Sequence, residues 1–589
     1  MKILVYRKIL IIPSVLVFLA WGFNSCKKYL EVEPISSFGT DYVFGSVTNA
    51  RTALLGVYAS LTGDQGYGIR VSMYYPYDND LMMGQGGTPY PDNERRDIAH
   101  FNLNANNTQL AAPFNQLYSG IEKANICIYN IPKMEGYGNS TELKRMHGEA
   151  LTLRALFYLE LIRNWGDVPA QFLPSSVETD LFKAKMDRDT IYEHLLEDLG
   201  IAATLVPWRT QVATDERITQ GAVRGLRARI ALYRGGYSLR RSKQMQRGSN
   251  HQIYYKIAKD ECTAIMQSNQ HNLNSSYESV FKNYIAGKQI EPNGEVLWEV
   301  AMAGGNSALG DSKLGYYCGP RANNNGNSAL NILPNYFYLF DSSDKRRDVV
   351  CAPYYVEATG TTITARTGRG LEAMPDGNFR RDWIPGGLTI GPQYFGVNWP
   401  ILRYSDVLLM FAEADNEINN GPSAEAKAAF EKVRLRAFGG DAGLIGTIPS
   451  DYAGFFNAIV KERALELGAE GIRKYDLIRW NLMTTKIAET KAVLAAMSAR
   501  QAPYDTLPDY MFYLDNSPTL TWASSYYKPN LIGSTAPTGY TRVNWVRDNI
   551  GSTILPYYAI AFTPNKSELL PIPQASIDAN PKLTQDYGY

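Results

Sequence analysis

The sequence predicts a mainly α-helical protein: a tetratricopeptide-like helical-repeat scaffold with a loop-rich second region that contains short strands. Three observations support this class. Apolar residues recur at helical spacing in many segments, neighbouring segments are joined by short connections, and three long stretches are instead rich in Gly, Asn, Pro and Tyr. Because the helical pairs do not follow a strict period of about 34 residues, we expect an irregular repeat.

The clearest helix is expected over residues 141–164. Its apolar face carries Leu143, Ala150, Leu153, Phe157 and Leu161. Ser140 or Thr141 can cap its start, Gly166 lies just past its end, and Pro169 prevents continuation. The same spacing predicts helices at about 44–62, 109–131, 187–205, 215–236, 251–268, 403–420, 423–438 and 452–486.

The irregular stretches span about 63–108, 271–400 and 500–589. Loops of this length in a compact protein are usually functional. Within the second stretch, residues 295–300 (EVLWEV) have the pattern of a strand. No linker rich in Pro, Ser and Gly divides the chain, so we expect residues 26–270 and 271–589 to fold together as one unit.

The N-terminal segment predicts export. Three basic residues precede an apolar run over about residues 9–23, as in a signal peptide of residues 1–25. The run is shorter than the roughly 20 residues that a transmembrane helix needs. The sequence Phe23-Asn24-Ser25-Cys26 resembles a bacterial lipobox, although Phe23 stands where Leu is usual. We therefore expect lipid on Cys26 and a membrane-anchored protein; the alternative is a plain signal peptide with a coincidental cysteine.

The charge balance argues against a nucleic-acid partner. The chain has a formal net charge of +1, and removing the three positive charges of residues 1–25 leaves −2. Nucleic-acid binding needs a basic face, which this composition does not favour. The chain is rich in aromatic residues, with 40 tyrosines and nine tryptophans. We expect most of them to pack helices together and the exposed ones to offer flat contact surfaces.

No motif predicts catalysis, a cofactor or a metal site. The five histidines are scattered, and the sequence lacks HExxH, GxSxG and GxxxxGK[ST]. The remaining cysteines are far apart and form no CxxC pair: Cys127, Cys262, Cys318 and Cys351. We expect buried free thiols, while an oxidising compartment would also allow a disulfide.

Five separated segments together resemble the SusD/RagB family, the nutrient-binding outer-membrane lipoproteins of the Bacteroidetes. Residues 26–34 (CKKYLEVEP) are similar to the mature start of the family. The other four segments are residues 148–169, residues 402–414 (LRYSDVLLMFAEA), residues 462–480, and residues 571–589 with their closing QDYGY. The resemblance covers nearly everything after Cys26.

This resemblance implies a surface-exposed lipoprotein of the cell outer membrane that captures an oligosaccharide. It implies a lid on a TonB-dependent, SusC-like transporter barrel, with the helical-repeat face docking the barrel and no chemistry on the ligand. Three alternatives stay open: the same scaffold with a peptide as cargo, a surface glycoside hydrolase, and an adhesin or purely structural lipoprotein.

Opposite charges recur three residues apart within 462–479: Arg463 and Glu466, Glu470 and Arg473, Arg473 and Asp476, Asp476 and Arg479. Because leucines and a tryptophan accompany them, we expect these charges to hold helix against helix in a partly buried network. A rival interpretation takes Glu462, Glu466 and Glu470 as sources of the acid and base of a glycoside hydrolase, whose carboxylates lie about 5–9 Å apart. The family resemblance favours the structural interpretation.

Ligand contacts are expected in two aromatic and polar loops, because sugar sites pair flat rings with Asp, Asn and Arg. In the family, the ligand site is built from loops in comparable regions. The first loop supplies the candidates Tyr75, Tyr77, Asp78, Asp80 and Tyr90. The second supplies Tyr317 and Arg321, with Trp383 further along. The alternative is that such residues fill gaps beneath the loops. Asp78 and Asp80 also leave open a bound calcium ion.

Overall fold

The structure is a computed structural model that describes residues 39–84, 91–213, 216–389, 391, 393–529, 532–546 and 550–589. Its internal contacts divide the chain into two units, residues 1–50 and residues 51–589. The described part of the first unit holds α3 (Thr40–Val43) and the start of α4 (Val47–Tyr58). All further elements belong to the second unit.

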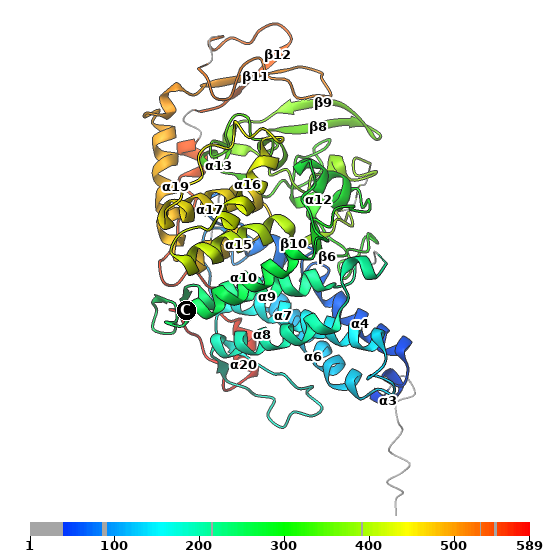
Figure 1. Cartoon of the computed structure of the whole chain (residues 1–589). Coiled ribbons are helices and arrows are strands. Elements are labelled where there is room, and N and C mark those ends of the chain that lie inside the picture. Colours follow the sequence, from blue (N-terminus) through cyan, green and yellow to red (C-terminus); the bar gives the residue numbers. More distant parts are fainter. Residues whose placement is uncertain are drawn as a thin grey trace, which may run out of the picture. The chain divides into compact units, whose positions relative to one another are not determined.

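A series of packed helices forms the scaffold of the second unit (Figure 1). Each of the first five packs against the next: α6 (Ala111–Asn130), α7 (Thr141–Trp165), α8 (Arg188–Leu205), α9 (Gln220–Gly235) and α10 (His251–Gln267). Helix α10 then packs against α15 (Tyr404–Asn419), which contacts α16 (Ala424–Ala437) and α17 (Tyr452–Leu467). The mainly helical class is confirmed, and the scaffold continues across the long excursion of residues 268–403.

Local signals explain the ends of α7, and a glycine explains one helix break that the periodicity did not predict. Ser140 Oγ accepts a hydrogen bond from the Leu143 amide at 3.2 Å. The segment expected as one helix over 452–486 is instead α17, α18 (Arg473–Arg479) and the beginning of α19 (Met483–Ser498). Between α17 and α18, Gly471 has φ +71°, and a Cβ there would lie 2.9 Å from the Trp399 ring. Only glycine tolerates that combination, so the chain turns here.

The described strands form two-stranded antiparallel sheets. Their pairs are β1 (Met82–Met83) with β7 (Asn331–Ile332), β2 (Val168–Pro169) with β3 (Lys185–Met186), β4 (Ser238–Leu239) with β5 (Met245–Gln246), β6 (Val296–Val300) with β10 (Trp399–Arg403), β8 (Tyr354–Thr359) with β9 (Thr362–Gly368), and β11 (Tyr510–Leu514) with β12 (Tyr540–Asn544). The strand predicted at 295–300 is β6. The shorter helices are α5 (Arg95–Ala99), α11 (Tyr277–Ser279), α12 (Leu314–Tyr317), α13 (Pro334–Phe337), α14 (Arg347–Val350) and α20 (Gln574–Ala579).

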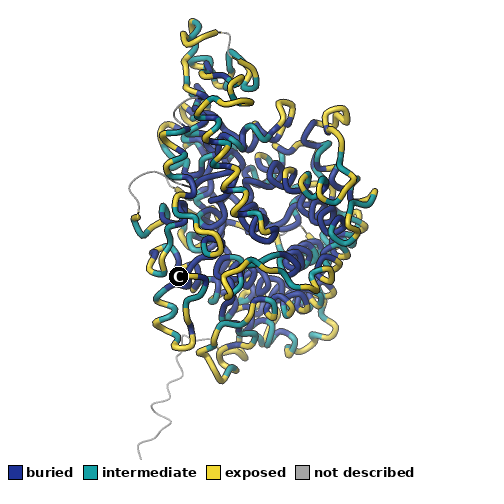
Figure 2. The backbone as a smooth tube through the Cα atoms, turned by 90° about the vertical axis from the view of Figure 1, so that its left-hand side faces the viewer, coloured by how far each residue is buried: buried dark blue, intermediate teal, exposed yellow. Residues whose placement is uncertain are grey.

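Burial follows the helices, while exposed residues gather on turns and loops (Figure 2). Cys127, Cys262, Cys318 and Cys351 are buried free thiols, as the sequence predicts. Of the helices that the structure describes, none combines the length and the apolar character that crossing a membrane requires.

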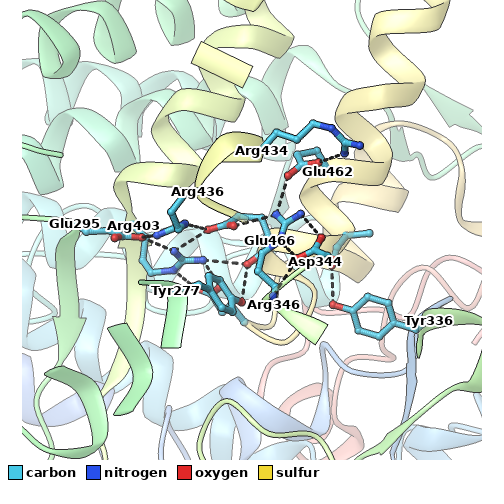
Figure 3. Close-up of polar contacts among 12 residues, drawn as sticks. Tyr277, Glu295, Tyr336, Asp344, Arg346, Arg403, Arg434, Arg436, Glu462 and Glu466 are labelled. Carbon is cyan, nitrogen blue, oxygen red and sulfur yellow. Dashed lines mark hydrogen bonds and ion pairs between the residues drawn. The ribbon is translucent and has the colours of Figure 1, made fainter. Parts of the chain in front are cut away.

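A buried network of arginines and carboxylates joins the helices to the excursion between α10 and α15 (Figure 3). We call it the Glu466 network; its members are Glu295, Asp344, Arg346, Arg403, Arg434, Arg436, Glu462, Glu466 and Glu470. Glu466 in α17 accepts from Arg346 at 3.1 Å, from Arg403 at 3.0 Å and from Arg436. Three guanidinium groups therefore converge on one buried carboxylate.

The arginines also reach segments that are distant in the sequence. Arg403 donates to both oxygens of Glu470, at 2.7 and 2.6 Å, and to Glu295 at 2.9 Å. Arg346 is fully buried and pairs with Asp344 and with Glu462, the latter at 2.7 Å. Burying a charge is costly unless it is paired, so these contacts fix how β6, β10, α16 and α17 meet.

The structural interpretation of the charged motif is confirmed, but most of the expected partners are wrong. Among the four pairs spaced by three residues, only Asp476 and Arg479 form an ion pair, at 2.8 Å. Arg463 instead contacts Asp406 and Asp476, and Arg473 contacts Asp80. The helix break between α17 and α18 separates Glu470 from Arg473 on the helix surface, and Glu466 is already surrounded by the three arginines of its network.

We expect Glu466→Gln to lower the free energy of unfolding by about 3–5 kcal/mol, because three buried arginines lose a shared counter-charge. Chemical denaturation followed by circular dichroism measures this. The control is Asp260→Asn, which removes an exposed pair with Lys256 (2.9 Å) and should change stability little. Similar small effects in both variants would contradict the buried network.

The network also predicts an acid-sensitive fold. Burial raises the pKa of Glu466, but Arg436, Arg403 and Arg346 outweigh it and lower that pKa from 4.5 to about 2. Between these values the unfolded chain binds a proton that the folded chain does not, so stability is lost as the pH falls from about 4.5 towards 2. Glu466→Gln should lose less stability than the wild type over this range in urea unfolding; equal losses would contradict the prediction.

Candidate ligand-binding site

Three residues predicted to touch a ligand lie in the core instead of at the surface. Tyr75 and Tyr77 are buried, and their hydroxyls donate to the carbonyls of Gln109 and Ala469, each at 2.7 Å. Asp80 is buried and accepts two hydrogen bonds from Arg473, at 2.9 and 2.7 Å. These contacts tie Tyr75 to the segment just before α6, and tie Tyr77 and Asp80 to α18 and the turn before it. In this position the three side chains support the loops above them.

Asp78 is also buried but lies beside a small hollow. Its carboxylate accepts from the Gly84 amide at 2.8 Å. Burial raises its pKa to about 6, against the opposing effects of Lys474, the Gly84 hydrogen bond and Arg95. Tyr74 and Arg95 line the same hollow. Asp78 therefore lies directly beneath a group of half-buried aromatic and cationic side chains.

That group joins the two loops that the sequence analysis singled out. The Arg95 guanidinium lies 5.2 Å from the ring centroid of Tyr74 and 5.2 Å from that of Tyr317. The two rings meet edge to face at 6.4 Å, and Tyr316 packs against Tyr317 at 5.2 Å. Cation–π contacts of this kind hold rings in place at a surface. We call these four residues the Arg95 cluster.

The chain after Tyr317 forms a tight loop that reaches β8. Asn323, Asn324 and Ser328 have left-handed backbone conformations, which Asn tolerates better than most residues. The Asn323 amide donates to the Val356 carbonyl at 2.9 Å, and Asn323 Oδ1 accepts from the Ala358 amide at 2.8 Å. The loop is thereby fixed along the edge of the β8–β9 hairpin.

The loop of residues 318–329 and the β8–β9 hairpin border an open groove of about 410 Å3, which we call the hairpin groove. It is lined by Asn323, Asn324, Tyr355, Val356, Glu357, Ala358, Thr364 and Thr367. The Tyr355 ring lies 5.7 Å from the guanidinium of Arg321 and 4.5 Å from that of Arg369. One aromatic ring, two amides and two hydroxyls thus line one open surface, the combination that suits a ligand with apolar faces edged by hydroxyls.

The remaining predicted residues fall outside this groove. Trp383 is half-buried, with the Arg380 guanidinium 4.2 Å from its ring. Arg380 also donates to the hydroxyl of Tyr354 at 2.7 Å. Tyr354 and Tyr355 are successive strand residues, so their side chains point to opposite faces of the hairpin. Because Arg380 contacts both Tyr354 and Trp383, Trp383 lies on the face away from Tyr355. Tyr90 and Cys26 lie outside the described residues.

The sequence patterns did not single out five residues that line the groove: Tyr355, Asn323, Asn324, Thr364 and Thr367. Two signals could have found them. The run Asn-Asn-Asn-Gly-Asn-Ser at 323–328 is typical of a tight loop with left-handed residues. The β-branched residues on both sides of Gly360 are typical of a hairpin. Within the described part of the chain, no three His, Cys, Asp or Glu side chains are placed to hold a metal ion.

Comparison with known proteins decides the family. Residues 381–589 match the model of the SusD family, and residues 69–232 match a second model described as starch-binding associating with outer membrane. SusD-like protein P25 of Formosa agariphila is 25% identical over 547 residues, which cover 86% of this chain and 97% of that protein. The chain belongs to the SusD/RagB family. The segments that resemble the family overlap three of the scaffold helices, α7, α15 and α17.

Solved structures of SusD-like proteins share the fold. A crystal structure of a SusD homolog from Bacteroides thetaiotaomicron superposes with a TM-score of 0.74 at 22% identity, covering 93% of this chain and 98% of that one. A laminarin-binding SusD-like protein superposes with a TM-score of 0.62 at 19% identity, covering 92% of this chain and 99% of that one. The helical scaffold and the excursion between α10 and α15 are therefore parts of one shared architecture.

We expect Tyr77→Phe to lower the free energy of unfolding by about 1–3 kcal/mol, because the buried carbonyl of Ala469 loses its donor. Tyr355→Phe is the matched control, since Tyr355 is half-buried at the groove, and it should change stability little. Urea unfolding measures both. A neutral Tyr77→Phe would contradict the buried, supporting position of Tyr77.

Proposed function

We propose that this protein binds a glycan at the hairpin groove and delivers it, chemically unchanged, to a transporter of the outer membrane. The observation that carries this proposal is the placement of Tyr355 beside two asparagines and two threonines in an open groove. A sugar ring can lay its C–H face on the tyrosine, while its hydroxyls exchange hydrogen bonds with the amides and hydroxyls.

The extent of the groove suits an oligosaccharide more than a single sugar. Its volume of about 410 Å3 lies within the range of ligand pockets. From the groove, Arg321 and the loop of residues 318–329 lead back to Tyr316 and Tyr317 of the Arg95 cluster, whose carbonyls accept from the amides of Asn327 and Ala329. A chain of several sugar units could therefore extend from Tyr355 towards Tyr317.

The positions of the carboxylates support binding without hydrolysis. Glycoside hydrolysis uses two carboxyl groups about 5–9 Å apart. Among the described residues that line the groove, Glu357 alone carries a carboxylate. The rival set Glu462, Glu466 and Glu470 is buried in contact with arginines and has no open face for a sugar. The groove is thus suited to holding a glycan and lacks the acid–base pair.

The family matches support a proposal for how the protein is anchored and which partner it has. The matching model is described as starch-binding associating with outer membrane, and one solved relative is titled as laminarin-binding. We propose that lipid on Cys26 holds this protein at the surface of the outer membrane. We further propose that the helical-repeat face docks a TonB-dependent, SusC-like barrel, over which the protein acts as a lid. The loops that carry the groove would then face the transported glycan.

We expect saturable binding of an oligosaccharide from a panel that includes laminarin and starch fragments, measured by isothermal titration calorimetry. Tyr355→Ala should weaken it at least 10-fold, because a stacking ring at the groove is lost. Tyr129→Ala in α6 is the matched control, a half-buried tyrosine that also has a cation, Lys133, over its ring, and it should bind like the wild type.

Two results would contradict the proposal. One is sustained release of new reducing ends during incubation with the bound glycan, which would indicate a hydrolase. The other is saturable binding of peptides with no binding of any glycan in the panel, which would indicate the peptide-binding alternative on the same scaffold.

A further inference from the structure

A second cavity, of about 360 Å3, lies beside β6 and near the start of α9. It shares no lining residue with the hairpin groove. Its floor includes the buried side chains of Trp298 and Asn398, and its rim includes the exposed residues Glu216, Lys288 and Ile290. We call it the Trp298 cavity. Its volume lies at the small end of the range for ligand pockets.

The floor of the cavity holds a hydrogen-bond donor without a partner. Trp298 is 4% exposed, and its indole N–H makes no hydrogen bond to any described residue. Leaving a buried donor unsatisfied is costly, and most buried polar groups in folded proteins are paired. An acceptor atom of a ligand in the cavity would satisfy this indole.

Beside Trp298, one amide bridges two carboxylates. Asn398 Nδ2 donates to Glu216 at 3.0 Å and to Glu299 at 2.9 Å, while Asn398 Oδ1 accepts from the Met302 amide at 2.9 Å. The two accepting carboxylate oxygens are therefore within about 6 Å of each other. Within the described part of the chain, neither carboxylate forms an ion pair with a lysine or arginine. Their remaining oxygens are available to donors of a ligand.

The environment of Glu299 agrees with a buried carboxyl group that forms no ion pair. Burial, with a further contribution from the charge of Glu216, raises the pKa of Glu299 to about 7, against the opposing effects of the Asn398 hydrogen bond and Lys288. A buried carboxylate without an ion pair can accept more hydrogen bonds than the one that Asn398 donates to Glu299.

The two features together define the ligand. It must accept from the Trp298 indole and donate to the carboxylates. An ammonium group only donates, and a carboxylate or phosphate only accepts, whereas a hydroxyl or an amide group does both. The proposed function selects the hydroxyl from these two. The charged residues of the lining are balanced, with Arg209, Arg217 and Lys288 against Glu216, Glu291 and Glu299, so the lining has no net charge that would select an anion or a cation. Ile290, 76% exposed at the rim, offers an apolar surface for a C–H face.

We propose that the Trp298 cavity is a second saccharide site, separate from the hairpin groove, that takes one or two sugar rings. This inference rests on the proposed function for the class of ligand, but on none of the residues of the groove. It assigns the direct polar contacts with the sugar hydroxyls to Trp298, Glu216 and Glu299, while Asn398 holds the two carboxylates in place.

The test uses the full chain and titrates maltose, cellobiose and lactose by calorimetry into four forms of the protein. These are the wild type, Tyr355→Ala, Trp298→Phe and the double variant. In Tyr355→Ala we expect saturable binding to persist at the cavity. Adding Trp298→Phe, which keeps a six-membered aromatic ring but removes the indole N–H, should weaken that remaining binding at least 10-fold. Trp298→Phe alone should leave binding of longer glycans at the groove unchanged.

A second measurement does not depend on the variants folding well. In protein labelled with 15N-tryptophan, the indole resonance of Trp298, assigned by its absence in Trp298→Phe, should shift on adding the disaccharide that binds. No shift with any of the three sugars would overturn the proposal, as would unchanged disaccharide binding in the double variant. Saturable binding of glycine or ethanolamine in place of sugars, or release of new reducing ends, would also overturn it.

The proposal for the cavity and the proposal for the groove can fail independently of each other in these measurements. If Tyr355→Ala left the binding of longer glycans unchanged, the proposal for the groove would fail, while the indole shift would still report on the cavity.

Discussion

The fold depends on a single physical constraint, the pairing of buried arginines with buried carboxylates around Glu466. Three arginines from the loop after α13, from the end of β10 and from α16 converge on one carboxylate of α17. A buried charge without its partner is costly, so these segments can pack only in the arrangement that pairs all of them. The long excursion between α10 and α15 is held near both ends, by Glu295 and by Arg403.

The same principle extends from the network to the candidate sites. Arg473 in α18 pairs with Asp80, beneath the loop that carries Tyr74 and the Arg95 cluster. Asn398, at the floor of the Trp298 cavity, directly precedes β10, whose last residue is Arg403. The network thus gives a rigid base to loops whose upper faces remain polar and open. A binding protein needs this division, since fixed loops lose less entropy when they bind a ligand.

Much of the helical scaffold could be predicted from the sequence, because apolar spacing and helix caps are local properties. The bounds of α7, α8 and α10 follow them within a few residues. The ion pairs could not be predicted, since their partners lie far apart in the chain; Arg473 meets Asp80 and not its neighbour Glu470. Composition pointed to loops near the candidate site but not to the direction of each side chain. Tyr75 and Tyr77 were predicted as contacts but are buried, and Tyr355, which lines the candidate groove, was not among the predicted residues.

Buried charges fix the frame of the protein, and the loops above that frame carry the candidate ligand site. Hydrogen exchange measured by mass spectrometry, with and without a saturating glycan, tests this most directly. Exchange in α15–α18 should be slow in both states, and added protection should appear in residues 316–329 and 354–367. Protection that appears in the scaffold helices, with none in those two segments, would contradict the account.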